Sequence, residues 1–255
     1  MAKPLLERQV NLIEHMTSGA VIFGAEGDSA ADLEGIDRAL LRVEAQFSYA
    51  KRMEKITAVL PRTFELLGSG EAEVVRAFVE ECPPTTLSRL VNACQFHGFL
   101  VSRWRREPPD PPYICDVAAC EIAFAKVDAD PQHHSSDRTT SVDRARRGSI
   151  RRCPNVILLR CAYDVRPIFE PPLPTLPRMR GRVGEGAVPA KRETPLVVAL
   201  PPGADGPQVF EIVPAIFDLL SLLDDWIDPQ QLAADPQFTE LLADLASRGL
   251  IEVRR

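Results

Sequence analysis

Apolar residues recur at spacings of three and four positions through the first half of the chain, which is the period of an amphipathic helix. Clusters of glycine or proline separate the successive runs. After a proline-rich connector at 108–112, residues 113–127 continue the same pattern. We therefore predict an all-helical domain over residues 1–128. Its earlier apolar runs cover residues 36–47, 56–67, 74–78 and 87–104.

Near residue 153 the pattern changes to the alternation that is typical of β-strands. Residues 156–165 predict one long strand or a bent pair of strands. Residues 196–200 and 208–213 predict a hairpin closed by a turn that begins Pro-Pro-Gly. We expect these segments to form one sheet.

Helices follow the predicted hairpin. Pro214 suits the first turn of a helix, because its missing N–H is not needed there. A short helix is predicted at 229–234, and a third helix ends at Gly249 before a closing strand at 250–253. This order of elements is that of a winged helix. The sequence thus predicts an α+β fold in which a winged-helix-like domain over 153–255 follows the helical domain.

Two segments interrupt this organisation. Residues 129–152 are polar and basic, which predicts a linker or a long ordered excursion, and they include Arg146 and Arg147. This basic run could meet an acidic partner surface through guanidinium contacts, and the alternative is a solvated loop. Residues 170–195 are rich in proline, glycine and arginine, which predicts a mobile loop.

Composition limits the classes of function. The chain has 255 residues, of which 45% are hydrophobic, so two globular domains are expected. A formal net charge of -6 argues against a general affinity for nucleic acid or anionic membranes. No apolar run reaches the length of a membrane span, and the N-terminal residues predict an amphipathic helix rather than a secretion signal. We expect a cytoplasmic protein.

No catalytic motif is found in the sequence. It lacks a glycine-rich phosphate loop, a nucleophile elbow and a His-Glu-x-x-His pair. The six cysteines are scattered without a Cys-x-x-Cys pair. A zinc site would combine Cys115 and Cys120 with His133 and His134, but this spacing matches no tight zinc pattern. We therefore predict reduced, structural thiols, no catalytic residue, and neither a metal nor a cofactor in this chain.

The C-terminal module predicts a binding surface. Its third helix carries Glu240 and Asp244 with Arg248 as the only base, so duplex DNA is a poor ligand for it. An edge strand and this helix could instead form a groove in which an extended peptide adds a strand. The alternative is that both elements only pack internally. The predicted peptide-binding residues are Val209, Phe210, Glu211, Ile212, Val213, Phe238, Leu241, Leu242 and Leu245.

Several motifs of the helical half resemble a known family. They run in the order Leu-Pro-Arg-Thr-Phe-Glu-Leu-Leu-Gly at 60–68, Ala-Phe-Val at 77–79, Pro-Pro-Thr-Thr-Leu at 83–87 and Pro-Tyr-Ile-Cys-Asp-Val-Ala-Ala-Cys-Glu at 112–121. Segments at 154–159 and 163–165 also resemble the family's second half. The family was once labelled as DNA-binding proteins. It includes the partner subunits of TIM-barrel multinuclear iron oxidases, of the MbnC type in methanobactin biosynthesis and the TglI type in 3-thiaglutamate biosynthesis.

This resemblance implies a non-catalytic subunit whose C-terminal domain resembles a precursor-peptide recognition element. The partner would be a TIM-barrel iron oxidase that holds the iron, forms a heterodimer with this chain, and modifies a cysteine of a ribosomally made peptide. The full C-terminal module favours the thiaglutamate type. We place the oxidase-binding surface on the helical half and the basic run, with Trp104, Tyr113, Arg146 and Arg147 as candidates. The alternatives are a DNA-binding transcriptional regulator, with the arginines of the basic run as contacts, and a self-sufficient metalloenzyme.

Overall fold

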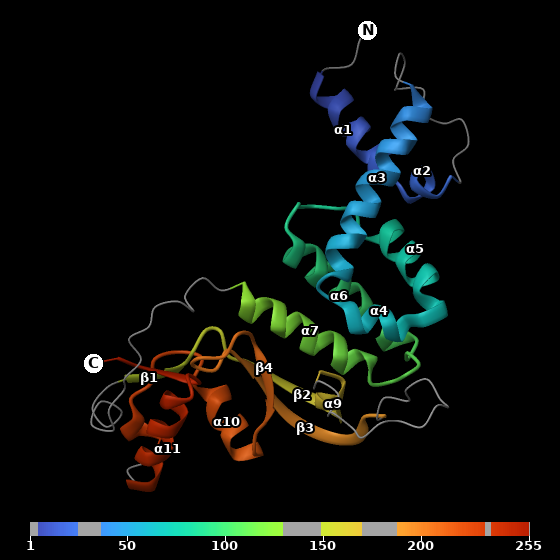
Figure 1. Ribbon diagram of the computed structural model, residues 1–255. Coiled ribbons are helices and arrows are strands. Elements are labelled where there is room, and N and C mark those ends of the chain that lie inside the picture. Colours follow the sequence, from blue (N-terminus) through green and yellow to red (C-terminus); the bar gives the residue numbers. More distant parts are fainter. Residues whose placement is uncertain (1–4, 25–36, 130–148, 170–187, 233–235, 255) are drawn as a thin grey trace. The chain divides into compact units, whose positions relative to one another are not determined.

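The computed structural model of the chain describes residues 5–24, 37–129, 149–169, 188–232 and 236–254 (Figure 1). The fold is α+β: a helical region from α1 to α7 precedes a region of small antiparallel sheets and helices. The chain divides into two compact units, Met1–Ala118 and Ala119–Arg255, here named the helical unit and the sheet unit. Their boundary lies inside α7 (Ile114–Asp128), earlier in the chain than the predicted boundary at 128.

Local signals set the ends of the helices in the helical unit. Asp37 caps α3, because its carboxylate accepts hydrogen bonds from the N–H groups of Ala39 and Leu40. The Ser88 hydroxyl caps α6 in the same way, and Pro61 occupies the first turn of α4. The elements are α1 (Leu5–Thr17), α2 (Gly19–Phe23), α3 (Arg38–Thr57), α4 (Pro61–Leu67), η1 (Gly68–Gly70), α5 (Glu71–Glu81), α6 (Arg89–Arg106) and the start of α7.

An aromatic cluster forms the core of the helical unit. The ring of Phe96 stacks on Phe64 with centroids 5.3 Å apart and meets Phe78 edge-on at 4.9 Å. Phe96 and Phe78 are fully buried, so α4, α5 and α6 are held together by the same side chains. Buried aromatic pairs of this kind contribute about 1 kcal/mol beyond their buried area.

The sheet unit is built on three antiparallel strands in the order β2-β3-β4. Residues Ile157 and Val198 are partners between β2 and β3, and Val197 and Phe210 are partners between β3 and β4. The prediction that the long strand joins the hairpin in one sheet is confirmed. The elements are β1 (Ser149–Arg152), β2 (Ile157–Asp164), α9 (Arg166–Phe169), β3 (Ala190–Ala199), β4 (Gln208–Glu211), α10 (Pro214–Leu222), η3 (Pro229–Gln231), α11 (Pro236–Ser247) and β5 (Ile251–Arg254).

Apolar side chains cover both faces of this sheet. On one face, Val198 packs with Ala123 and Val127 from the C-terminal part of α7. On the other face, the neighbouring Val197 belongs to a larger cluster with residues of α10, α11 and β5, including Leu220. Adjacent residues of a strand point to opposite faces, so β3 is buried on both sides and supports the whole unit.

Two segments differ from the sequence-based expectation. The closing strand β5 pairs with β1, which lies inside the predicted linker 129–152. Three of the four residues of β1 are polar, so the apolar pattern did not indicate a strand there. Ile150 is nevertheless fully buried, and it exchanges two backbone hydrogen bonds of 2.8 Å with Ile227. Similarly, β3 begins at Ala190, inside the predicted mobile loop 170–195, because charged residues occupy its exposed start. The rest of that loop up to residue 187 lies outside the described residues.

None of the helices in the described part of the chain is both long enough and apolar enough to cross a membrane.

Candidate peptide-binding site

Strand β4 is the edge of the three-stranded sheet (Figure 1). It pairs with β3 on one side, and no strand in the described ranges pairs with its other side. An open edge carries backbone donors and acceptors that can pair with a further extended chain.

The register shows which backbone groups of β4 point outward. The N–H of Ile212, just past the end of the strand, donates to the carbonyl oxygen of Pro195 at 3.0 Å. In an antiparallel ladder, inward and outward backbone groups alternate from one residue to the next. The groups of Gln208 and Phe210 therefore face β3, whereas those of Val209 and Glu211 face the open edge. An added strand could pair with these two residues.

Two apolar side chains lie exposed along this edge. The side chain of Phe210 is 38% exposed and that of Val213 is 61% exposed. Phe210 is the partner of Val197, so it points to the face that α10 and α11 cover. A peptide side chain on that face of an added strand would meet the phenyl ring.

The remaining predicted peptide-binding residues divide between surface and core. Leu242 is 1% exposed and Leu245 is also buried, so these two side chains pack internally, as the alternative interpretation of the third helix requires. Phe238 and Leu241 are partly buried at the border of the same cluster, together with Ile212. Residues of the strand and of the helix therefore belong to one apolar cluster. Only the partly buried ones, Ile212, Phe238 and Leu241, have side-chain surface that a peptide could contact. Val209 belongs to the opposite face and packs against α7.

A cluster of four charged side chains holds the C-terminal end of β4, named here the ion-pair cluster. Arg166 donates from Nε and Nη2 to the two carboxylate oxygens of Asp164 at 2.8 and 2.6 Å, and from Nη2 to Glu211 at 2.5 Å. Arg192 donates to Glu211 at 2.7 Å and to Asp164 at 2.9 Å. Two guanidinium groups thus face two carboxylates, and the cluster links β2, α9, β3 and β4 with no net charge.

The cluster shifts the titration of its carboxylates. Hydrogen bonds from Arg166, together with those from Arg192, lower the pKa of Asp164 to about 2. Hydrogen bonds from Arg192 lower the pKa of Glu211 as well. Both carboxylates therefore stay ionised at neutral pH. The ion-pair cluster beside the open edge holds its side chains in place, and its two positive charges are paired with its two negative charges.

The predicted partner-binding residues are dispersed. Trp104 in α6 is 8% exposed, so its indole is part of the helical core and offers little surface to another protein. Tyr113, just before α7, is half-buried. Arg146 and Arg147 lie outside the described residues.

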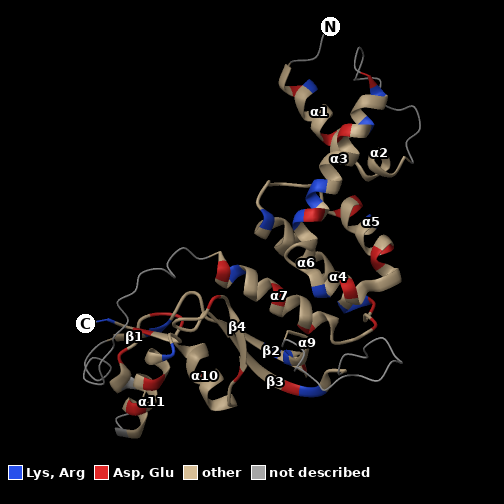
Figure 2. Ribbon diagram, viewed as in Figure 1, with Lys and Arg blue, Asp and Glu red and all other residues tan. Residues whose placement is uncertain are grey.

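The third helix of the sheet unit, α11, is acidic on its surface (Figure 2). Arg248, which directly follows the helix, donates from Nε to the carboxylate of Asp244 at 2.9 Å. A guanidinium neutralised in this way contributes little to phosphate binding, so the geometry of α11 agrees with the sequence-based argument against DNA.

The cysteines are dispersed through the structure. All six cysteines are free, and Cys120, Cys153 and Cys161 are buried. Burial raises the pKa of the Cys115 thiol, which disfavours its thiolate. Within the described ranges, no three His, Cys, Asp or Glu side chains gather in a way that could hold a metal ion. His133 and His134 of the considered zinc site lie outside these ranges.

Asp164, Arg166 and Arg192 were not singled out by the sequence. Asp164 ends β2, Arg166 begins α9, and Arg192 lies in the exposed charged start of β3, so none of them belongs to a recognisable motif. Only the pairing of three strands shows that their charges meet Glu211, and no local pattern encodes that register.

No protein-family model matches the chain, and a search of the curated proteins finds no matching sequence.

Proposed function

We propose that this chain is an accessory subunit that binds the leader of a ribosomally made precursor peptide and presents its cysteine to a separate multinuclear iron oxidase. The observation that carries the proposal is the open edge of β4, with outward backbone groups at Val209 and Glu211 and the exposed ring of Phe210 beside them. The leader would add to β4 as a fourth antiparallel or parallel strand.

The arrangement around this edge supports a peptide rather than DNA as the ligand. Three strands followed by α10, η3 and α11 make the sheet unit similar to a winged helix, and its third helix is acidic. The same order of elements resembles a precursor-peptide recognition element, which agrees with the motif resemblance of residues 60–121. The iron and the oxidative chemistry belong to the partner in this proposal, whose product would be a modified cysteine of the 3-thiaglutamate or methanobactin kind.

Exposed apolar residues in the helical unit support a heterodimer. Leu40, Val43 and Phe47 lie three and four positions apart on α3, and each is more than half exposed. This spacing places them on one face of the helix. We assign the oxidase contact to this face, in place of the buried Trp104. Crosslinks from the oxidase should map to it, and crosslinks confined to the sheet unit would refute the assignment.

A proline substitution tests the strand addition. Val209→Pro removes an N–H that faces the open edge, whereas the ladder between β3 and β4 loses no bond. Because one hydrogen bond is lost and the ring obstructs an approaching strand, peptide affinity should fall about tenfold. Val209→Ala is the matched control, since it loses at least as much side-chain packing against the cluster of Ala123, Val127 and Val198 but keeps the N–H.

The measurement combines binding and turnover. The chain is co-expressed with a TIM-barrel iron oxidase and a candidate precursor peptide, and the peptide is analysed by mass spectrometry after co-purification. An oxygen-dependent mass change on a cysteine that is lost with Val209→Pro and kept with Val209→Ala supports the proposal. Equal affinity of the two variants for the peptide would refute the pairing of the leader with β4. Salt-dependent binding of duplex DNA by the unaltered chain would instead favour a DNA-binding regulator.

A further inference from the structure

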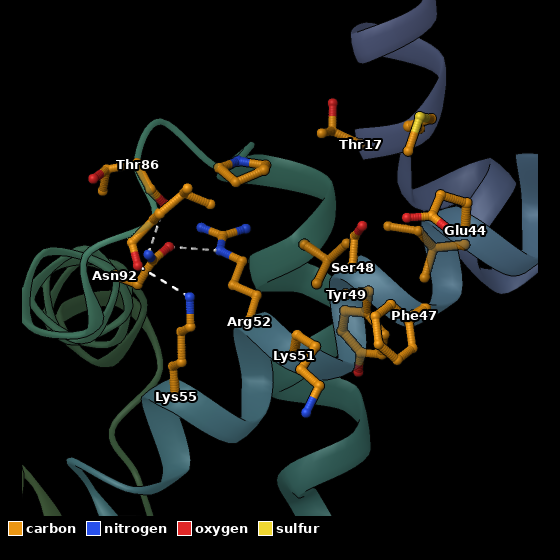
Figure 3. Close-up of a pocket in the computed structure, with 15 residues that line it drawn as sticks. Thr17, Glu44, Phe47, Ser48, Tyr49, Lys51, Arg52, Lys55, Thr86 and Asn92 are labelled. Carbon is orange, nitrogen blue, oxygen red and sulfur yellow. Dashed lines mark hydrogen bonds between the residues drawn. The ribbon is translucent and has the colours of Figure 1, made fainter.

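A cavity of about 350 Å³ lies within the helical unit (Figure 3). It is lined by residues of α1, α2, α3 and α5, by the segment that precedes α6, and by the first turn of α6. A volume of this size is at the lower end of the range for small-molecule sites, which is about 300 to 1,000 Å³.

One side of the cavity carries a buried cation. Arg52 of α3 is 8% exposed, and its guanidinium lies 4.5 Å from the centroid of the Phe78 ring. It donates from Nε to the Asn92 side-chain oxygen at 3.0 Å and from Nη2 to the Gln95 side-chain oxygen at 2.8 Å. It also donates from Nη1 to the carbonyl oxygen of Cys82 at 2.8 Å.

All three of these acceptors are neutral. A guanidinium has five N–H groups, so two remain without an acceptor among the described residues. No carboxylate in the described ranges lies within salt-bridge distance of Arg52. Burial of the charge lowers the pKa of this arginine below its usual value. A buried charge without a counter-ion is costly, and an anion beside it would offset that cost.

A second cation extends the same side of the cavity. Lys55 lies one helical turn after Arg52, and its ammonium donates to the carbonyl oxygen of Leu87 at 3.1 Å, again a neutral acceptor. Lys51 also lines the cavity, but its ammonium is 2.9 Å from the Glu54 carboxylate. Among the described residues that line the cavity, Glu44 is the only acidic one. Positive charge is therefore in excess around Arg52 and Lys55.

The rest of the lining is largely apolar. Ile22 and Val79 are buried in the wall, and Leu87 stands exposed at its border. Figure 3 shows Arg52 and Lys55 extending from α3 toward Asn92 and Thr86, whereas the ring of Phe47 lies toward the other end. The cavity thus combines a cationic end with an apolar body.

We infer that this cavity binds a small monocarboxylate with an apolar chain or ring. The carboxylate would accept from the two remaining N–H groups of Arg52 and from Lys55, and the apolar part would lie against Ile22, Val79 and Leu87. A guanidinium matches the two oxygens of a carboxylate, and the surrounding low dielectric strengthens the pair. The inference is independent of the peptide site, so failure of one does not affect the other.

Calorimetry on the full chain with octanoate as the probe tests this inference, with 1-octanol as the uncharged probe of equal length. We expect octanoate to bind at least about tenfold more tightly than octanol, because only the anion can pair with the cations. Absence of octanoate binding would overturn the inference. Equal affinities for the two probes would also overturn it, because the cavity would then be only an apolar cleft.

Four variants of the lining residues locate the carboxylate. Lys55→Gln should weaken octanoate binding about fivefold, and Lys51→Gln should leave it nearly unchanged, because the Lys51 charge is already paired with Glu54. Glu44→Gln should raise the affinity for octanoate about two- to threefold, because it removes a negative charge from the lining. An effect of this size is typical of one exposed charge interaction. Arg52→Gln should abolish binding, and where this variant does not fold, the Lys55 and Glu44 variants decide. Equal effects of the two lysine variants would refute the assignment of the carboxylate to the Arg52 end.

Discussion

Arg52 in the helical unit and Arg166 in the sheet unit are both held by several hydrogen bonds, but their acceptors differ in charge. Arg52 donates to two side-chain amides and a carbonyl. Arg166 donates to the carboxylates of Asp164 and Glu211. The first arrangement leaves a positive charge for which an anionic ligand can compensate, whereas the second leaves no net charge beside an open strand edge.

The difference decides what each unit can bind. Beside β4, the charged groups satisfy one another, and the groups left for a ligand are the outward backbone of Val209 and Glu211 and the ring of Phe210. Such a surface suits an extended peptide bound through its main chain. In the helical unit the available group is the charge itself, enclosed by apolar walls, which suits a small anion.

Each unit contains one of the two tryptophans of the chain, so the two units can be followed separately. Trp104 is in α6, and Trp226 lies beyond α10. Trp226→Phe leaves a fluorescence signal from the helical unit alone, and Trp104→Phe leaves one from the sheet unit. Each variant below is combined with the background that reports on its own unit.

The largest effect is expected from Arg52→Gln. The substitution removes a guanidinium that fastens α3 to the segment before α6, and it leaves the buried oxygen of Asn92 without its donor. We expect the helical unit to lose about 3 kcal/mol of unfolding free energy, as is usual when one partner of a buried charged network is removed. Denaturant unfolding followed through Trp104 measures this loss.

Lys51→Ala is the matched control on the same helix. Its ammonium and the Glu54 carboxylate are both more than half exposed, so the cost should stay below about 0.5 kcal/mol. If both substitutions lower the unfolding free energy of the helical unit by the same amount, Arg52 contributes no more to stability than an exposed lysine does. When the same two substitutions are made in the Trp104→Phe background, the unfolding followed through Trp226 should be unchanged.

An intermediate effect is expected from Asp164→Asn. The substitution removes the carboxylate that receives three of the hydrogen bonds in the ion-pair cluster. After allowance for solvent screening, we expect the sheet unit to lose about 1 to 2 kcal/mol at neutral pH. The measurement is denaturant unfolding followed through Trp226.

The pH dependence of that loss checks its origin. Folding lowers the pKa of Asp164 from an ordinary value of 3.8 to about 2, so the unfolded chain takes up the proton first as the solution is acidified. The stabilisation is therefore complete above about pH 5 and is lost between roughly pH 4 and pH 2. The difference between the original chain and Asp164→Asn should shrink over this window. A difference that stays constant down to pH 2 would show that packing, not charge, causes it.

The sequence predicted the elements with strong periodicity and missed those whose residues are mostly polar. The helices of the first half and the hairpin of β3 and β4 follow from apolar spacing and turn residues, because burial of their apolar faces is a local property of the pattern. Strand β1 could not be found in this way, since Arg151 and Arg152 are only partly buried and pair with carboxylates, and Ile150 alone in the strand is buried.

The candidate site shows the same limit. The edge strand 208–213 was predicted, but which of its residues face outward depends on the register with β3. Leu242 and Leu245 share the helical period of Phe238 and Leu241, and the pattern alone does not tell a groove from a core. The positive charge of Arg52 gave no signal either, because the acceptors around it come from residues thirty to forty-three positions away.

The smallest effects are expected where β1 meets β5, the pairing that the sequence did not reveal. Arg151 contacts the carboxylate of Glu252 at 2.9 Å and lies 4.7 Å from the centroid of the Trp226 ring. Arg254 reaches the same ring at 5.7 Å but is exposed. Arg151→Gln should cost about 1 kcal/mol, since it loses a half-buried ion pair and a cation–π contact, whereas Arg254→Gln should cost less than about 0.5 kcal/mol.

Arg151 and Arg254 both lie over the ring of Trp226, but only Arg151 also pairs with the carboxylate of Glu252 among the described residues. Comparing them tests whether a paired carboxylate changes what an arginine contributes to stability. Unfolding of the Trp104→Phe background with each substitution gives the two free energies. Arg151→Gln should also shift the Trp226 emission more than Arg254→Gln, as the closer guanidinium is removed. If the two substitutions cost the same, the paired carboxylate adds nothing to an arginine in the sheet unit. The difference between Arg52 and the arginines of the sheet unit would then be explained by burial and not by the charge of their hydrogen-bond acceptors.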